Sequence, residues 1–206
     1  MLHKFGWPFR TLYPYMEWRK PASDKKTIYL TFDDGPVPVA TEFVLETLRS
    51  FDVKATFFCV GDNVRKHPAV FERVVAEGHH WGNHTYNHLN GRQHTLEGYL
   101  ENVERCQQQL PSISGRPLFR PPYGRLKYKQ ALELKKKYRV IMWDVLTGDY
   151  NPGLPKKKCL KNAIRATENG SIVLYHDSMK AYDTLCYVLP RYIETMLAKG
   201  YQFKVL

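Results

Sequence analysis

Two adjacent carboxylates, Asp33 and Asp34, stand at the end of an apolar run in the segment TFDDGP. Inside a regular β-strand, neighbouring side chains point to opposite faces of the sheet. Both carboxylates can therefore face one site only if the strand ends there, and Gly35-Pro36 provides the break. Taken alone, such a segment is more often an ordinary polar turn, so its meaning depends on partners elsewhere in the chain.

Two histidines stand four residues apart, His84 and His88 in the segment HTYNH. We expect this spacing to place both imidazoles on one face of a helical turn, within reach of one metal ion. Together with Asp34 they offer two nitrogen donors and one carboxylate. Catalytic zinc sites and non-haem iron enzymes both use such a set, and both leave coordination positions open for water and substrate.

Two more ionisable side chains follow apolar runs, Arg120 in RPPYG and His176 in LYHD. Arg120 can pair with a carboxylate, and His176 can donate a proton. Singly, an arginine at a strand end is more often part of a surface salt bridge, and a histidine there is more often a satisfied polar group. The occurrence of all these groups at predicted strand ends makes coincidence a poor explanation.

The hydrophobic pattern predicts the elements that position these residues. Continuous apolar runs predict buried strands at 27–32, 55–60, 139–143, 171–175 and 202–206. Amphipathic patterns predict helices at 41–51, 68–77, 96–110 and 189–199, and the lysine runs 135–137 and 156–158 lie in segments expected to be surface helices. This alternation predicts an α/β fold with a parallel sheet or barrel, in which functional residues follow the strand ends.

In order and spacing, five segments resemble the five motifs of polysaccharide deacetylases with the NodB homology domain. These segments are TFDDGP, HTYNH, RPPYG, the stretch from Trp143 to Tyr150, and LYH. The family includes chitin and peptidoglycan N-acetylglucosamine deacetylases. The resemblance implies a distorted (β/α) barrel with seven strands over residues 27–206. We expect the aromatic segment 1–26 to pack on this catalytic domain rather than to form a small exposed docking surface.

Carried over residue by residue, the resemblance implies that Asp34, His84 and His88 bind one divalent metal ion, usually zinc. Asp33 matches the general base of the family, and His176 matches its general acid. The implied activity is that of a metal-dependent hydrolase that removes acetyl groups from N-acetylated amino sugars in a polysaccharide or oligosaccharide.

Four further positions match family residues that support this chemistry. Arg120 matches the arginine that holds the base, and Asp149 matches the aspartate that orients the acid histidine. Tyr123 matches the residue whose backbone N–H helps to bind the oxyanion. Leu174 matches the apolar residue that lines the pocket for the acetyl methyl group.

The fourth motif departs from the family pattern. It is LTGDY here, where the family commonly shows Asp-x-x-Asp-Trp. Asp149 preserves the second aspartate, but Leu146 replaces the first, and Tyr150 replaces the tryptophan. The metal ligands are unaffected. The support of the arginine and the stacking of the sugar ring are changed, which points to an altered substrate.

Composition fits one globular domain and sets expectations for its partners. Lysine and arginine exceed aspartate and glutamate by 31 to 20, a formal net charge of +11, which favours contact with anionic partners such as acidic glycans. No recognised nucleic-acid-binding motif accompanies this charge, so no nucleic-acid partner is expected. The four cysteines lack CxxC spacing and are expected to be free thiols.

Localisation follows from the same composition. No run approaches the roughly 18 uncharged apolar residues of a membrane span. The first twenty residues are interrupted by Pro8, Arg10 and Pro14 and lack the apolar stretch of a signal peptide. We therefore expect no membrane span and a cytoplasmic protein, with a monomer slightly favoured over an oligomer.

Several other functions fit part of the pattern. A carbohydrate-binding pseudoenzyme would keep the pocket without turnover, but Asp33 and His176, the two residues that match proton-transfer groups, are both present. A deacylase of a smaller acylated amine would use the same residues. An iron oxygenase would share the ligand set, but a paired base and acid are features of hydrolysis. A nucleic-acid-binding domain is supported by charge alone.

Overall fold

A computed structural model describes residues 14–22 and 24–206 of the chain. Among these residues, one sheet runs in the order β5-β4-β3-β2-β1-β7-β6, and β8 pairs with the start of β1. All these strand pairs are parallel. The strands are β1 (Thr27–Asp33), β2 (Thr56–Cys59), β3 (His80–Asn83), β4 (Leu118–Phe119), β5 (Arg139–Val140), β6 (Val145–Leu146), β7 (Ser171–His176) and β8 (Gln202–Phe203).

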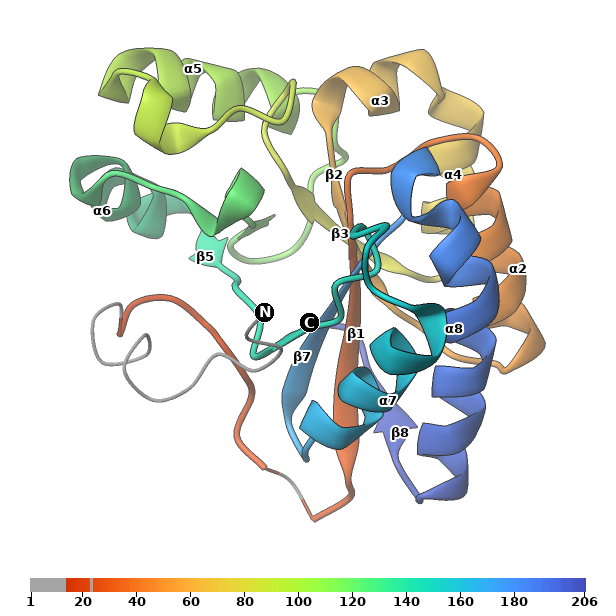
Figure 1. Ribbon diagram of the computed structural model, residues 1–206. Coiled ribbons are helices and arrows are strands. Elements are labelled where there is room, and N and C mark those ends of the chain that lie inside the picture. The colour runs from red at the N-terminus through yellow and green to blue at the C-terminus, as the bar shows by residue number, and fades with distance from the viewer. Residues whose placement is uncertain (1–13, 23) are drawn as a thin grey trace.

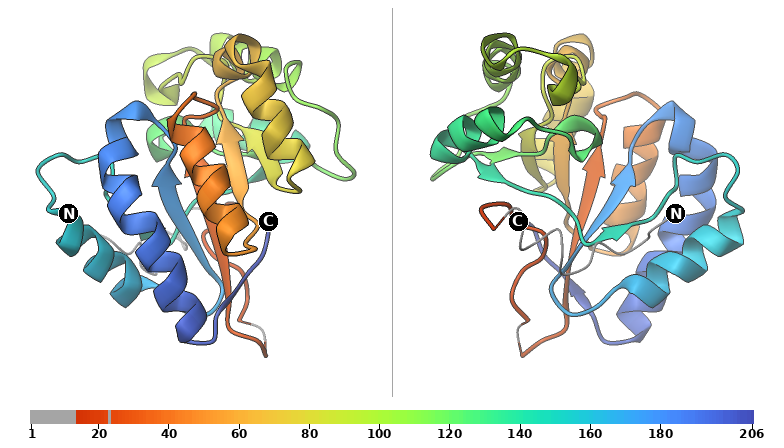
Figure 2. Two further views of the ribbon diagram at one scale, coloured as in Figure 1. Left: turned by 90° about the vertical axis from the view of Figure 1, so that its right-hand side faces the viewer. Right: turned by 60° about the vertical axis from the view of Figure 1, so that its left-hand side comes forward.

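Helices follow most strands and cover the outside of the curled sheet (Figures 1 and 2). They are α2 (Ala40–Ser50), α3 (Gly61–Lys66), α4 (Pro68–Ala76), α5 (Leu96–Gln107), α6 (Tyr128–Lys137), α7 (Lys156–Ala166) and α8 (Met179–Ala198), with 3-10 turns at Gly91–Gln93 and Pro122–Gly124. One apolar cluster includes buried side chains of β1, β2, α2 and α8, and a second includes buried side chains of β4, α5 and α6. The fold is the expected distorted (β/α) barrel.

The barrel is interrupted between β5 and β6, and the segment before β1 lies at this gap. Glu17 N–H donates to the Val140 carbonyl oxygen at 2.8 Å, and Met142 N–H donates to the Glu17 carbonyl oxygen at 2.8 Å. Met16 and Trp18 are buried in the second apolar cluster. The expectation for residues 1–13 falls outside the described part of the chain.

The predicted elements are present, with differences at the short strands and at two helices, because α3 was not predicted and α8 is longer than expected. Strand ends were expected before His84 and Arg120, but no bounds were predicted for β3, β4 and β6, because they are only two to four residues long or mix polar with apolar residues. Both lysine runs lie in helices, α6 and α7, as expected. Helix α8 begins at Met179 rather than at 189. Pro190 therefore lies inside the helix, although proline favours the first turn of a helix.

Candidate active site

The chemically active side chains converge at the carboxyl ends of parallel strands. Strand β1 ends at Asp33 and β7 ends at His176, and these two residues are paired in the sheet register. The other groups follow strands β3, β4 and β6; they are His84, His88, Arg120 and Asp149. Because parallel strands direct their carboxyl ends to one edge of the sheet, residues far apart in sequence meet there.

Asp33 and Arg120 form a buried ion pair. The Arg120 Nη1 atom lies 2.6 Å from Asp33 Oδ1, and both side chains are almost wholly inaccessible. The other carboxylate oxygen, Asp33 Oδ2, lies 3.7 Å from His84 Nε2. Burial raises the pKa of the Asp33 carboxyl, and the Arg120 guanidinium opposes that effect. Arg120 therefore fixes one oxygen of this carboxylate and leaves the other facing the histidines.

The buried guanidinium of Arg120 is satisfied without the carboxylate that the family pattern places at position 146. Its nitrogen atoms donate to Thr31 Oγ1 at 2.8 Å, to the Met142 carbonyl oxygen at 2.9 Å and to the Ile141 carbonyl oxygen at 3.3 Å. The guanidinium carbon also lies 4.0 Å from the centre of the Phe58 ring. Backbone carbonyl groups and a hydroxyl group thus support the arginine where Leu146 cannot.

The three candidate metal ligands come together as the sequence predicted. Asp34 Oδ1 lies 3.3 Å from His88 Nε2 and 3.8 Å from His84 Nε2. One donor atom from each residue lies within 4.8 Å of the others. Zinc bonds of about 2.0 to 2.2 Å in a tetrahedral site place donor atoms about 3.3 to 3.6 Å apart, and the separations of 3.3 and 3.8 Å here are close to that range.

The prediction of a helical turn at the two histidines is wrong. The residues after β3 form an irregular loop, in which Thr85 has a φ of 65° and His88 a φ of 58°. This left-handed backbone reverses the chain, so the loop brings the two imidazoles together, with ring centroids 5.2 Å apart. Convergence of His84 and His88 was correctly predicted, but by a different local structure.

Two features of the donor set fit a bound cation. Asp34 Oδ1 is buried and has no hydrogen-bond partner among the described residues, which is costly unless another ligand satisfies it. His84 Nδ1 lies 2.8 Å from the Arg120 carbonyl oxygen, so Nδ1 carries the proton and Nε2 is free to coordinate. Burial lowers the pKa of His84 to about 3, which keeps the imidazole neutral as a metal ligand must be.

Asp34 is held in place by residues to which sequence reasoning assigned no role. Its φ is 88°, and its carbonyl oxygen accepts a hydrogen bond from Asn63 Nδ2 at 2.7 Å. The next residue, Gly35, donates its N–H to Asp177 Oδ1 at 3.0 Å, and a Cβ added at Gly35 would meet Asp177 Oδ2 at 1.9 Å. Asp177 also accepts from Thr41 Oγ1 at 2.7 Å. The turn after β1 is therefore held by side chains from three other segments of the chain, those of Asn63, Asp177 and Thr41.

His176 forms a second buried pair with Asp149. The His176 Nδ1 atom lies 2.9 Å from Asp149 Oδ1, and Asp149 Oδ2 accepts the His176 backbone N–H at 2.7 Å. Thr147 Oγ1 donates to the same carboxylate at 3.1 Å. Burial opposes a charged imidazole, but the Asp149 carboxylate, together with those of Asp34 and Asp33, outweighs it and raises the pKa of His176 to about 9. The ring is therefore cationic at neutral pH, and its Nε2 can donate a proton.

The three predicted substrate contacts differ in their positions. The ring of Tyr123 lies 4.6 Å from that of His88, and the ring of Tyr150 lies 4.9 Å from that of His176. These two aromatic side chains therefore contact different histidines of the site. Leu174 is 1% exposed and belongs to the second apolar cluster, so its role beside an acetyl group stays a prediction.

The family follows from comparison with known proteins. A family model described as polysaccharide deacetylase matches residues 20–141. The chain belongs to this family. A peptidoglycan-N-acetylglucosamine deacetylase of Bacillus cereus is 32% identical over 196 residues, which cover 92% of this chain and 90% of the relative.

Solved structures agree with this assignment. A crystal structure of a peptidoglycan N-acetylglucosamine deacetylase with a bound naphthyl N-oxidanyl-benzamide matches with a TM-score of 0.84 and 28% identity, over 98% of this chain and 95% of that one. A mutant CE4 family pseudoenzyme with restored enzymatic activity matches with a TM-score of 0.78 and 26% identity, over 90% of this chain and 67% of that one.

One further expectation from composition is confirmed. The cysteines are all free thiols, and Cys59 is buried in the core. Within the described residues, no helix is long and apolar enough to cross a membrane.

Proposed function

We propose that this chain uses one divalent metal ion, preferentially zinc, to remove acetyl groups from N-acetylated amino sugars in a glycan. One arrangement carries the proposal. Asp33, paired with Arg120, and His176, paired with Asp149, stand at adjacent strand ends beside the three-residue donor set. Hydrolysis of an amide needs one group that accepts a proton from water and another that donates a proton to the leaving amine. Here each of the two groups has its own charged partner. The similarity to a peptidoglycan deacetylase supports an acetylated cell-wall glycan as substrate.

Asp33 is the base in this proposal. When held by Asp34, His84 and His88, a divalent ion supplies Lewis-acid polarisation of the amide carbonyl and makes water more acidic. Asp33 then accepts a proton from water as the water oxygen forms a bond to the carbonyl carbon. Its Oδ2 is the acceptor, because Oδ1 is already bound by Arg120.

His176 is the acid. An amine departs from the tetrahedral carbon only when its nitrogen is protonated, and His176 Nε2 donates that proton as the C–N bond breaks. Asp149 occupies Nδ1 and favours the charged ring. In the same proposal, the Tyr123 backbone N–H helps to bind the oxyanion, Leu174 contacts the acetyl methyl group and Tyr150 contacts the sugar.

Asp149→Asn should move the alkaline limit of activity to lower pH. The pKa of His176, raised to about 9, means that the acid form is present below that pH and is lost as pH rises through it. Without the carboxylate the ring is a stronger acid, so the falling limb should shift down by about one to three pH units. A kcat profile from pH 6 to 10 measures this. An unchanged limb would show that His176 does not control it.

The activity itself is tested by acetate release from acetylated chitin oligomers and peptidoglycan fragments. We expect the zinc-loaded chain to release acetate, the chelated chain to be inactive, and added zinc to restore the rate. Release only from small acylated amines would assign the deacylase alternative. Glycan binding without any release would assign a carbohydrate-binding role, as for a pseudoenzyme.

His88→Ala should weaken zinc binding by more than about 100-fold. Loss of residues that merely support a metal ligand typically costs 10- to 100-fold in affinity, and loss of a ligand costs more. Competition with a chromophoric chelator measures the affinity directly, without reference to turnover. His67→Ala is the matched control, because His67 lies at the start of α4, outside the donor set. Equal zinc affinity in both variants would rule out the proposed metal site.

A further inference from the structure

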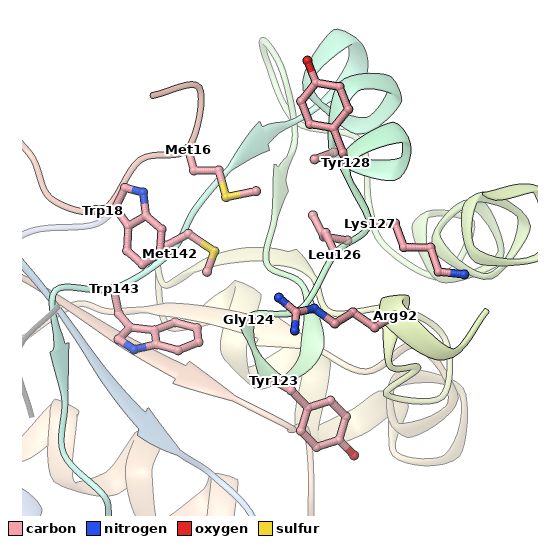
Figure 3. A pocket seen from close by; sticks show the side chains of 11 residues that line it. Met16, Trp18, Arg92, Tyr123, Gly124, Leu126, Lys127, Tyr128, Met142 and Trp143 are labelled. Carbon is pink, nitrogen blue, oxygen red and sulfur yellow. The ribbon is translucent and has the colours of Figure 1, made fainter. Parts of the chain in front are cut away.

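A cavity of about 170 Å³ lies behind the turn that carries Tyr123. We call it the Tyr123 cavity. Figure 3 shows its walls, with the cations Arg92 and Lys127 on one side and mostly apolar side chains on the other. The apolar wall is formed by Met16, Trp18, Met142 and Trp143. An apolar cavity of about 150 Å³ can hold a benzene molecule, so this one has room for a small branched or cyclic group.

The Tyr123 cavity adjoins the candidate metal site through one residue. Tyr123 lines the cavity, and its ring also lies 4.6 Å from that of His88, one of the candidate ligands. Tyr123 is 59% exposed and Tyr128 is 67% exposed, so two aromatic side chains on the cavity wall face solvent. Exposed aromatic rings beside a site for glycans offer surfaces on which sugar rings can pack.

The charged side chains that line this cavity are cationic. They are Arg92 and Lys127, and no aspartate or glutamate is among the lining residues. Lys127 Nζ donates to the His94 carbonyl oxygen at 2.8 Å rather than to a carboxylate. Arg92 is exposed, and no carboxylate among the described residues forms an ion pair with it. The cavity thus has apolar walls and an unneutralised positive rim.

We propose that the Tyr123 cavity is a subsite for a substituent on the sugar next to the one that is deacetylated. The substituent is a short aliphatic group that ends in a carboxylate. Its apolar part enters the cavity, and its carboxylate faces Arg92, where a charge-assisted hydrogen bond can form. The inference rests on the proposed function, because it assumes that a glycan lies across the metal site.

Binding measurements test this subsite without depending on turnover. The full-length Asp33→Asn variant is titrated with chitotetraose and with a tetrasaccharide of alternating N-acetylglucosamine and N-acetylmuramic acid. The second ligand carries a lactyl ether with a carboxylate on every other sugar. We expect it to bind about tenfold more tightly, the effect expected from one charge-assisted hydrogen bond at an exposed side chain. A salt concentration of about 0.15 M suppresses general attraction between distant charges.

Two substitutions locate the preference. Arg92→Gln should remove most of it, whereas Arg49→Gln, which changes the net charge equally at an exposed position on α2, should leave it intact. Ala131→Leu, which adds bulk to the cavity wall, should weaken binding of the carboxylate-bearing ligand more than that of chitotetraose. Equal affinities for the two ligands, or a preference that survives Arg92→Gln, would overturn the subsite. Failure of the proposed function would show itself separately, as no acetate release by the unsubstituted chain.

Discussion

Asp33→Asn should retain the metal and lose most of the deacetylation rate. The substitution removes the proposed base and leaves the donors Asp34, His84 and His88 in place. Loss of a group that transfers a proton typically lowers the rate by about 10² to 10⁴. The rate of acetate release should therefore fall within that range, while the zinc content of the same sample stays near one ion per chain. Both quantities need to be measured on one preparation.

Asp34→Asn is the matched comparison for this prediction. It neutralises the adjacent carboxylate but changes a proposed ligand, so zinc content and rate should fall together. In the Asp33→Asn protein, the new amide would still offer an oxygen to Arg120, whose guanidinium also keeps its bonds to Thr31 and to two backbone carbonyl groups. A thermal unfolding measurement would show whether the fold is preserved. Near-normal deacetylation by a fully metallated, folded Asp33→Asn protein would mean that this carboxylate is structural.

The sequence allowed the sheet and most of the site to be predicted because both depend on local patterns. Apolar runs rich in β-branched and aromatic residues, such as β1 and β7, favour buried strands, and polar residues directly after such strands are expected at the sheet edge. The pairing of Asp33 with His176 in the register of β1 and β7 follows from that rule. Short strands lack this signal. Strand β3 reads HWGN, which is too brief and too polar to stand out, although His84 follows it directly.

Other parts of the site depend on long-range contacts that no local pattern encodes. Thr85 has a left-handed φ, which β-branched residues rarely adopt, so no local pattern signalled the loop and the spacing of the histidines indicated a helical turn instead. Asn63 and Asp177 support the turn at Asp34 from α3 and from the end of β7. Ordinary polar residues of this kind carry no distinguishing signal until the fold brings them together.

The replacement at position 146 shows how such contacts change the interpretation of a motif. From sequence, Leu146 removed the expected support of Arg120. In the structure, the carbonyl groups of Ile141 and Met142 bind the guanidinium, and Met142 is in turn bound by Glu17. Residues before β1 therefore reach the Asp33–Arg120 ion pair through a single backbone segment. The altered motif changes the surroundings of the site while its buried ion pair is kept.

His176→Ala should reduce amide cleavage far more than cleavage of an activated aryl acetate. An amine leaves only after protonation, whereas a nitrophenolate is stable enough to leave without a proton. Removal of the acid should thus cost about 10² to 10⁴ in the rate on an N-acetylated sugar and much less on the aryl ester. The ratio of the two rates is the quantity to measure, because damage to the metal site or to the fold would lower both.

The same ratio separates the roles that His176 can have. Its ring contacts Tyr150, with centroids 4.9 Å apart, so the substitution also removes packing beside the proposed sugar site. Lost packing would weaken the binding of the sugar and raise its KM, but it would leave unchanged the dependence of kcat on the leaving group. Loss of the acid would instead make kcat depend steeply on the pKa of the leaving group, as the most basic amines suffer most. A series of aryl and alkyl amides measures that dependence. Equal losses in kcat across the series would reject the general-acid role and leave His176 as a binding or packing residue.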